Sequence, residues 1–209
     1  MSTARLAPGV TLFAGALDRA AQGALAASIL EGARAAPFYT PRMPRSGAAM
    51  SVLQTSFGAL GWVTDKAGGY RYQPLHPETG RAWPALPASL LALWRAHTDY
   101  RAPPDSCLVN LYRGQARMGL HVDADEAARD APVVSVSLGD DAIFRFGGVS
   151  RGARTRTVKL GSGDVLTLAR PARDCFHGID RVVSGSSALI AGGGRINLTL
   201  RRVTLPPDA

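Results

Sequence analysis

The stretch Cys107-Leu108-Val109-Asn110-Leu111-Tyr112 alternates, with Cys107, Val109 and Leu111 on one side and the other three side chains on the opposite side. This period of two predicts a β-strand, because successive side chains of a strand point to opposite faces. The same period continues toward the C-terminus, with turn residues about every 8–12 positions, which is typical of a sandwich or jelly roll. The further strands that we expect are 132–138, 142–146, 154–160, 164–168, a segment around Phe176, and 195–203, with a tight hairpin at 161–163.

Two helices are predicted before these strands. Residues 18–35 are rich in Ala and carry Leu and Ile at helical spacing, and Pro37 then ends the helix. Residues 88–98 place Leu90, Leu93, Trp94 and His97 on one face, so His97 is interpreted as a helix-face residue and not as a metal ligand.

The chain of 209 residues is long enough for one domain with a sizeable core. We therefore predict an α+β protein in a single domain over 1–209. An N-terminal part, about 1–85, begins with an extended lead-in at 1–15, and the jelly-roll core covers about 105–203. Residues 205–209 are expected to form a frayed tail.

Composition excludes several classes of protein. No apolar run reaches the length needed to span a membrane. The N-terminus has no charged segment followed by an apolar one, so no secretory signal is expected. Cys107 and Cys175 are the only cysteines and lack CxxC spacing, which argues against a zinc ribbon or a disulfide scaffold. A cytoplasmic protein, and a monomer, is the expectation.

The formal net charge is +8, and all but two of the 24 basic residues are Arg. Arginine binds phosphate in a bidentate manner and stacks on bases, so a basic surface suits a nucleic-acid partner. A coding bias toward Arg and Ala would explain the scarcity of Lys equally well, but it explains the net positive charge less well.

Residues 57–74 are rich in glycine and aromatic residues, and Trp62, Tyr70 and Tyr72 lie close in sequence to Lys66 and Arg71. Exposed aromatic side chains among basic ones suit base stacking. The residues alone favour the simpler interpretation that these three rings belong to the core of a small sheet.

His121 and Asp123 are separated by one residue, in a chain with only four histidines. Residues i and i+2 of a strand point to the same side, so these two side chains can bind one ion. Together with the distant His177 they have the linear form of a 2-His-1-carboxylate triad, which binds Fe(II) and leaves coordination positions open. A zinc hydrolase or a structural zinc site would use the same ligand types.

The last predicted strand has a basic and polar face. Arg195, Asn197, Thr199 and Arg201 share that face, whose burial would be costly without a partner. The two arginines, on opposite ends of a strand face ~20 Å long, can lean together and hold a small dicarboxylate, with Asn110 and Tyr112 as further donors. The simpler alternative is a solvent-exposed strand face.

Taken together, these motifs make the chain resemble the AlkB family of Fe(II)- and 2-oxoglutarate-dependent DNA-repair dioxygenases, and most of all its bacterial alkylation-repair members. Both family patterns, HxD…H and Rx5R, keep their order and spacing, and the match extends from about residue 48 to 202. The segments that carry the resemblance are Leu60–Trp62, Gly69–Tyr72, Trp83–Ala85, Asn110–Tyr112, His121–Glu126, Val134–Gly139, Phe144–Gly148, Phe176–Gly178 and Arg195–Arg201.

The resemblance implies a double-stranded β-helix (jelly-roll) core with N-terminal helices and a nucleotide-recognition lid. It also implies residue roles, as follows: His121, Asp123 and His177 bind Fe(II); Asn110, Tyr112, Arg195, Asn197 and Arg201 bind 2-oxoglutarate; Trp62, Tyr70, Tyr72, Asp125 and Arg151 contact the substrate. Trp62 and His121 would sandwich the base, and Asp125 would meet its exocyclic amine. Gln54 stands where the bacterial type has a second Met, and the loop at 38–48 also differs.

The implied reaction is oxidative demethylation of 1-methyladenine and 3-methylcytosine in alkylated DNA, in single strands or flipped from the stack. It consumes O2, converts 2-oxoglutarate to succinate and CO2, and releases formaldehyde. Two alternatives stay open. The same chemistry could act on RNA or on a substrate other than nucleic acid, or the chain could be a jelly-roll binding module with a structural metal.

Overall fold

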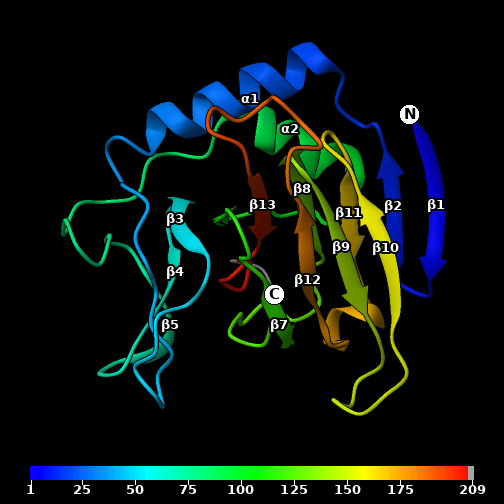
Figure 1. Ribbon diagram of the computed structural model, residues 1–209. Helices are drawn as coiled ribbons and strands as arrows, with labels where there is room; N and C mark the ends of the chain where they lie inside the picture. The colour runs from blue at the N-terminus through cyan, green and yellow to red at the C-terminus, as the bar shows by residue number, and fades with distance from the viewer. Residues whose placement is uncertain (207–209) are drawn as a thin grey trace.

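A seven-stranded sheet and a four-stranded sheet face one another in the computed structural model, which describes residues 1–206 (Figure 1). The larger sheet has the order β1-β2-β11-β8-β13-β6-β3 and the smaller sheet the order β10-β9-β12-β7. Residues 207–209, the end of the tail that was expected to fray, lie outside the described part of the chain. Two opposed sheets of this kind form a jelly roll, which confirms the predicted core.

The strands of the larger sheet are β1 (Ser2–Ala7), β2 (Val10–Ala14), β3 (Leu53–Gly58), β6 (Ser106–Tyr112), β8 (Val133–Gly139), β11 (Val165–Leu168) and β13 (Arg195–Arg201). The strands of the smaller sheet are β7 (Met118–His121), β9 (Asp141–Phe146), β10 (Arg156–Leu160) and β12 (His177–Val183). A short 3-10 turn, η1 (Ala172–Asp174), precedes β12.

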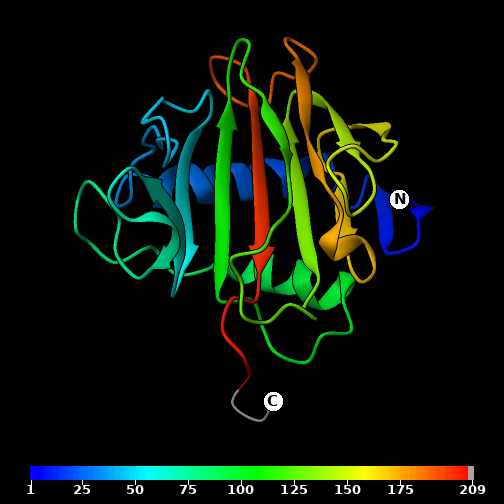
Figure 2. The same ribbon diagram turned by 90° about the horizontal axis from the view of Figure 1, so that it is seen from below.

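Two helices cover the outer face of the larger sheet, as Figure 2 shows. They are α1 (Arg19–Gly32) and α2 (Ala88–His97), close to the predicted ranges. Leu25 and Trp94 pack with the side chains of β6 and β13 that alternate toward them, such as Val109 and Leu198. The inner face of the same strands therefore carries the polar residues of β6 and β13 into the space between the sheets. Among the described residues, neither helix is long and apolar enough to cross a membrane.

Residues 1–15, which were expected to be an extended lead-in, instead form β1 and β2 at the edge of the larger sheet. The pattern was weak because four residues of β1 are exposed and only Val10 and Leu12 of β2 are buried.

The expected hairpin at 161–163 is also wrong. β10 pairs with β9, whereas β11 pairs with β2 and β8, so these residues carry the chain from one sheet to the other. Both flanking strands alternate normally, and alternation alone does not tell which sheet a strand joins.

A separate hairpin of β4 (Gly61–Asp65) and β5 (Gly69–Gln73) lies beside β3 at one edge of the molecule (Figure 1). It rests on a small apolar cluster of Ala36, Tyr39, Val63 and Trp83. Gly61 has no room for a side chain, since a Cβ there would lie 2.3 Å from the Trp83 ring. The β4–β5 hairpin is therefore anchored on one side and presents Trp62, Tyr70 and Tyr72 on its strands.

Candidate active site

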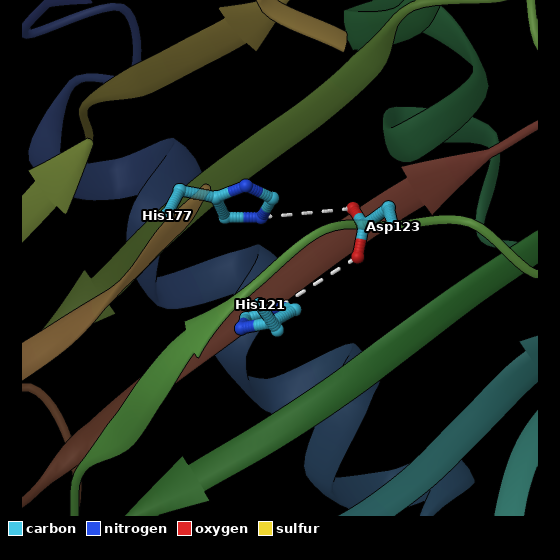
Figure 3. A group of neighbouring side chains, drawn as sticks. All are labelled: His121, Asp123 and His177. Atoms are coloured by element: carbon cyan, nitrogen blue, oxygen red, sulfur yellow. Dashed lines mark ion pairs between the residues drawn. The ribbon is translucent and has the colours of Figure 1, made fainter. Parts of the chain in front are cut away.

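His121, Asp123 and His177 form a cluster in which one possible ligand atom of each residue lies within 4.8 Å of the others. His121 and His177 are cross-strand partners in β7 and β12, which puts both imidazoles on one face. The Nε2 atoms lie 3.7 and 3.8 Å from the two oxygens of Asp123, just beyond the end of β7 (Figure 3). The structure thus brings together the three residues that the sequence analysis singled out.

Each imidazole of this cluster is oriented by a backbone carbonyl. Nδ1 of His121 lies 2.9 Å from the oxygen of Gly119, and Nδ1 of His177 lies 3.1 Å from that of Cys175. A hydrogen on Nδ1 can donate to these carbonyls, which leaves the Nε2 lone pairs directed at the centre of the cluster, as in protein metal sites. Such a donor set, two imidazoles and one carboxylate, suits a divalent iron.

Electrostatics keep His177 and Asp123 in the protonation states that bind metal. Burial lowers the pKa of His177 to about 4, with the nearby His121 acting in the same direction. Burial by itself would raise the pKa of Asp123, but the Arg201 guanidinium and the two imidazoles hold it well below its usual range. At neutral pH the site therefore offers a neutral His177 and an ionised carboxylate.

Arg195 and Arg201 lie on the inner face of β13 and are 1% and 6% exposed, which excludes the alternative of a solvent-exposed strand face. Arg195 donates from Nη2 to Ser137 Oγ at 3.0 Å, while its Nε and Nη1 are buried without a partner among the described residues. Unpaired donors on a buried guanidinium are costly, and a carboxylate group is the partner that fits them.

Arg201 is placed differently. Its Nη2 and Nε donate to the two carboxylate oxygens of Asp123 at 2.9 and 3.2 Å, and Nε also lies 3.3 Å from Glu126. The second arginine of the expected carboxylate clamp thus contacts a residue of the metal cluster directly.

A row of polar side chains crosses the inner face of the larger sheet. Asn197 of β13 is the cross-strand partner of Asn110 in β6, and Asn110 is that of Gln54 in β3. Tyr112 is the corresponding partner of Arg195, with the guanidinium carbon 5.4 Å from the ring centroid. Four of the five residues expected to bind 2-oxoglutarate therefore occupy neighbouring positions on β6 and β13, and Arg201 lies farther along β13, opposite Ser106.

Gln54 joins this row, although its only expected significance was as a departure from the family's bacterial type. It is fully buried and donates from Nε2 to Oδ1 of Asn110 at 2.8 Å. Its own Oε1 has no partner among the described residues. This hydrogen bond directs Oδ1 of Asn110 toward β3, so the Asn110 amide nitrogen points away from β3.

Two aromatic residues of the β4–β5 hairpin, Trp62 and Tyr72, contact the segment that follows β7. Trp62 donates from Nε1 to Asp125 at 2.7 Å and stacks on Tyr70, with ring centroids 5.5 Å apart. The Tyr72 hydroxyl donates to Glu126 Oε1 at 2.5 Å. These rings are thus not the core of the small sheet, which was the simpler interpretation; Tyr70 is 49% exposed.

Arg151 lies on the loop after β9, and its guanidinium carbon stands 5.2 Å from the ring centroid of Phe176, the neighbour of His177.

Two buried residues of the site, Glu126 and Arg173, had no assigned role. Arg173 lies in η1, four positions before His177, and the sequence there gave no sign that an arginine would be buried.

A family model described as the 2OG-Fe(II) oxygenase superfamily matches residues 9–201, so the fold and the site define a 2-oxoglutarate- and iron-dependent oxygenase. An AlkB homolog of Caulobacter vibrioides, an alpha-ketoglutarate-dependent dioxygenase, is 57% identical over 93% of this chain and 88% of its own length. AlkB of Escherichia coli is 42% identical over 75% of this chain and 73% of its own. The chain therefore belongs to the AlkB family.

The solved structure of OsALKBH1 is 28% identical and superposes with a TM-score of 0.81, covering 96% of this chain and 100% of that one. The enzyme is thus an Fe(II)/2-oxoglutarate-dependent dioxygenase that uses O2, and the structural-metal alternative is excluded. The residues present fit these cofactors, since the cluster supplies a suitable donor set and Arg195 presents buried donors that a carboxylate would satisfy.

Proposed function

We propose that this dioxygenase removes methyl groups from 1-methyladenine and 3-methylcytosine in DNA, within the cytoplasm and as a monomer. The observation that carries the proposal is the Asp123–Arg201 ion pair, which joins the metal cluster to the carboxylate-binding strand. Family membership and the hydrogen bond from Trp62 to Asp125, which follows Asp123 by two residues, support the substrate class.

In this proposal His121 and His177 bind the iron through Nε2, and Asp123 binds it through a carboxylate oxygen. Arg195 and Arg201 take the two carboxylates of 2-oxoglutarate. Asn110, Tyr112 and Asn197 assist them from the same sheet face. Bound together, iron and 2-oxoglutarate supply the oxidation of a methyl C–H bond by O2, with succinate and CO2 as products.

The base is held beside this centre. Trp62 and His121 stack on its two faces, and stacking contributes about 1–3 kcal/mol for each base. Asp125 accepts a hydrogen bond from the exocyclic amine, and its negative charge attracts the positive charge that N-methylation gives to these bases. Oxidation of the methyl group yields a hemiaminal, which loses formaldehyde and restores the base.

The nucleic-acid strand on either side of the base is bound by basic and aromatic side chains in this proposal. The net charge of +8 supplies the general attraction to phosphate. Tyr70, Tyr72 and Arg151 contact the strand or the base rim in this proposal. A single strand is the favoured form because the target base there requires no unpairing.

The experiment compares matched oligonucleotides that carry one 3-methylcytosine, as single-stranded DNA, duplex DNA and single-stranded RNA, with Fe(II) and 2-oxoglutarate. Mass spectrometry of the digested strand measures the restored cytosine. We expect repair of the single-stranded DNA, and none with Asp123→Ala. Repair confined to RNA would contradict the DNA assignment, and repair of no strand would contradict a nucleic-acid substrate.

A further inference from the structure

A buried network of charges lies behind the metal cluster, and its first member is Arg173. This side chain is 2% exposed and donates to three acceptors in the segment that follows β7. Nη1 binds the carbonyl of Asp123 at 2.6 Å, Nη2 binds Oε2 of Glu126 at 2.7 Å, and Nε binds the carbonyl of Ala131 at 3.1 Å. Arg173 thus fixes the backbone on which Asp123 and Asp125 stand.

Glu126 lies at the centre of this network and is 4% exposed. Its carboxylate receives Arg173 from the turn before β12, the Tyr72 hydroxyl from the β4–β5 hairpin, and Arg201 Nε from β13. A buried carboxylate is tolerated only when several donors satisfy it. These donors come from the metal-binding side, from the hairpin and from the proposed cosubstrate strand.

The contact with Arg201 is a shared one. Arg201 Nε carries one hydrogen. The Nε atom lies 3.2 Å from Asp123 Oδ2 and 3.3 Å from Glu126 Oε1, so the two carboxylates share this single donor. The Tyr72 hydroxyl donates to the same Oε1 atom and so occupies part of its acceptor capacity. If the hairpin withdraws this hydroxyl, Oε1 attracts Arg201 more strongly and draws the guanidinium away from Asp123.

We propose that Glu126 is a positioning residue that links the β4–β5 hairpin to Arg201. In this proposal 2-oxoglutarate binds more tightly when the hairpin is seated, that is, when the Tyr72 hydroxyl contacts Glu126. By thermodynamic reciprocity, bound 2-oxoglutarate also stabilises the seated hairpin. The inference rests on the proposed function of Arg201 as a ligand for a cosubstrate carboxylate. It gives the hairpin a second role besides contact with the base.

The test uses Tyr72→Phe, which removes the hydroxyl and keeps the ring. Glu126→Gln is less suitable because it leaves Arg173 and Arg201 buried beside a neutral group and can prevent folding. Tyr100→Phe is the matched control, since the Tyr100 hydroxyl also donates to a carboxylate, that of Asp130, outside the site.

Two binding measurements are made on protein loaded with Mn(II) in the absence of O2. Calorimetry gives the dissociation constant for 2-oxoglutarate, and amide hydrogen exchange gives the protection of residues 61–73. We expect 2-oxoglutarate to slow exchange across the hairpin in the wild type and in Tyr100→Phe. In Tyr72→Phe we expect this response to disappear and the dissociation constant to rise about 5-fold or more.

The outcomes separate the two proposals. An unchanged dissociation constant in Tyr72→Phe overturns the linkage, even if exchange of the hairpin becomes uniformly faster, because that pattern marks a purely structural hydroxyl. A wild-type protein that binds Mn(II) but no 2-oxoglutarate overturns the proposed function of Arg201 and the linkage with it.

Discussion

The indole Nε1 of Trp62 and Oδ2 of Asp125 are joined by a hydrogen bond of 2.7 Å, so two side chains proposed to hold the base bind one another. Trp62 belongs to the hairpin and Asp125 to the segment after β7. In the proposed reaction, a base that enters between Trp62 and His121 takes over the Asp125 carboxylate with its exocyclic amine. The hydrogen bond therefore marks where the substrate edge would lie.

Trp62→Ala tests this placement. The variant should bind an oligonucleotide with 3-methylcytosine more weakly by about 1–3 kcal/mol, because it loses one stacking surface. Fluorescence anisotropy measures the binding, and calorimetry with Mn(II) in the same variant provides the control. Metal affinity should stay unchanged; an equal loss of both affinities would mean that Trp62 supports the fold and not the base.

Arg195→Ala and Arg201→Ala should differ although both remove a proposed carboxylate ligand. Arg195 has unpartnered donors, so its loss should raise the concentration of 2-oxoglutarate needed for half-maximal turnover by about tenfold or more, the effect of losing a charged hydrogen bond. Arg201 pairs with Asp123 and Glu126. Glu126 keeps Arg173 and Tyr72 when Arg201 is lost, but the buried Asp123 carboxylate loses its arginine, which should destabilise the fold by about 3–5 kcal/mol.

Urea denaturation and steady-state kinetics separate these two effects. If Arg195→Ala leaves the 2-oxoglutarate requirement unchanged, the assignment of a carboxylate to its free donors is incorrect. If Arg201→Ala is as stable as the wild type, the ion pair with Asp123 is not a significant source of stability.

Gln54→Met installs the residue that the bacterial relatives were expected to carry. The donor to Asn110 disappears, so the Asn110 amide is free to turn, and the Kd for 2-oxoglutarate should rise a few-fold, the effect of one neutral hydrogen bond. Thermal stability should fall little, because the change also removes a buried carbonyl without a partner. Calorimetry and melting curves measure both effects, and a large loss of stability with unchanged 2-oxoglutarate affinity would assign Gln54 to packing alone.

The stability of the metal-free protein should depend on pH through His177. Its folded pKa is about 4, whereas an unperturbed imidazole titrates near 6.5, so between these values only the unfolded chain binds the proton. The free energy of unfolding should therefore decrease as pH falls from about 6.5 to 4. Each kcal/mol lost corresponds to about 2–4 °C in melting temperature.

Melting curves of chelator-treated protein at pH 5 and pH 7 test this expectation, with His177→Gln for comparison. The variant should lose part of the pH dependence. It keeps a remainder because burial also lowers the pKa of His97, which acts in the same direction. An identical pH dependence in the variant would assign the effect to other groups.

Much of the fold and of the site could be predicted because the informative residues alternate strictly. The alternation in β6 and β13 separates Val109 and Leu198, which pack under the helices, from Asn110 and Asn197, which face the other sheet. The HxD spacing predicted the metal-binding residues, and the helical spacing of apolar residues predicted the two helices. The predicted cluster of His121, Asp123 and His177 is present in the structure.

The remainder depends on contacts between distant segments. β1 offers no buried face, so its alternation carried no signal. Glu126 is buried because Tyr72 of β5, Arg201 of β13 and Arg173 of η1 converge on it, and a charged residue outside the main strands and helices is ordinarily solvated. The Asp123–Arg201 pair was likewise hidden, because the 78 positions that separate the two residues give no indication of their contact.

Oxidative demethylation by this enzyme is tested most directly by the ratio of formaldehyde to succinate that the wild type forms. The assay contains Fe(II), 2-oxoglutarate, O2 and single-stranded DNA with 3-methylcytosine. We expect one formaldehyde for each succinate whose formation depends on the lesion, and the loss of both products in Asp123→Ala. Lesion-dependent repair without succinate, or succinate formation that the lesion does not stimulate and that yields no formaldehyde, would contradict this expectation.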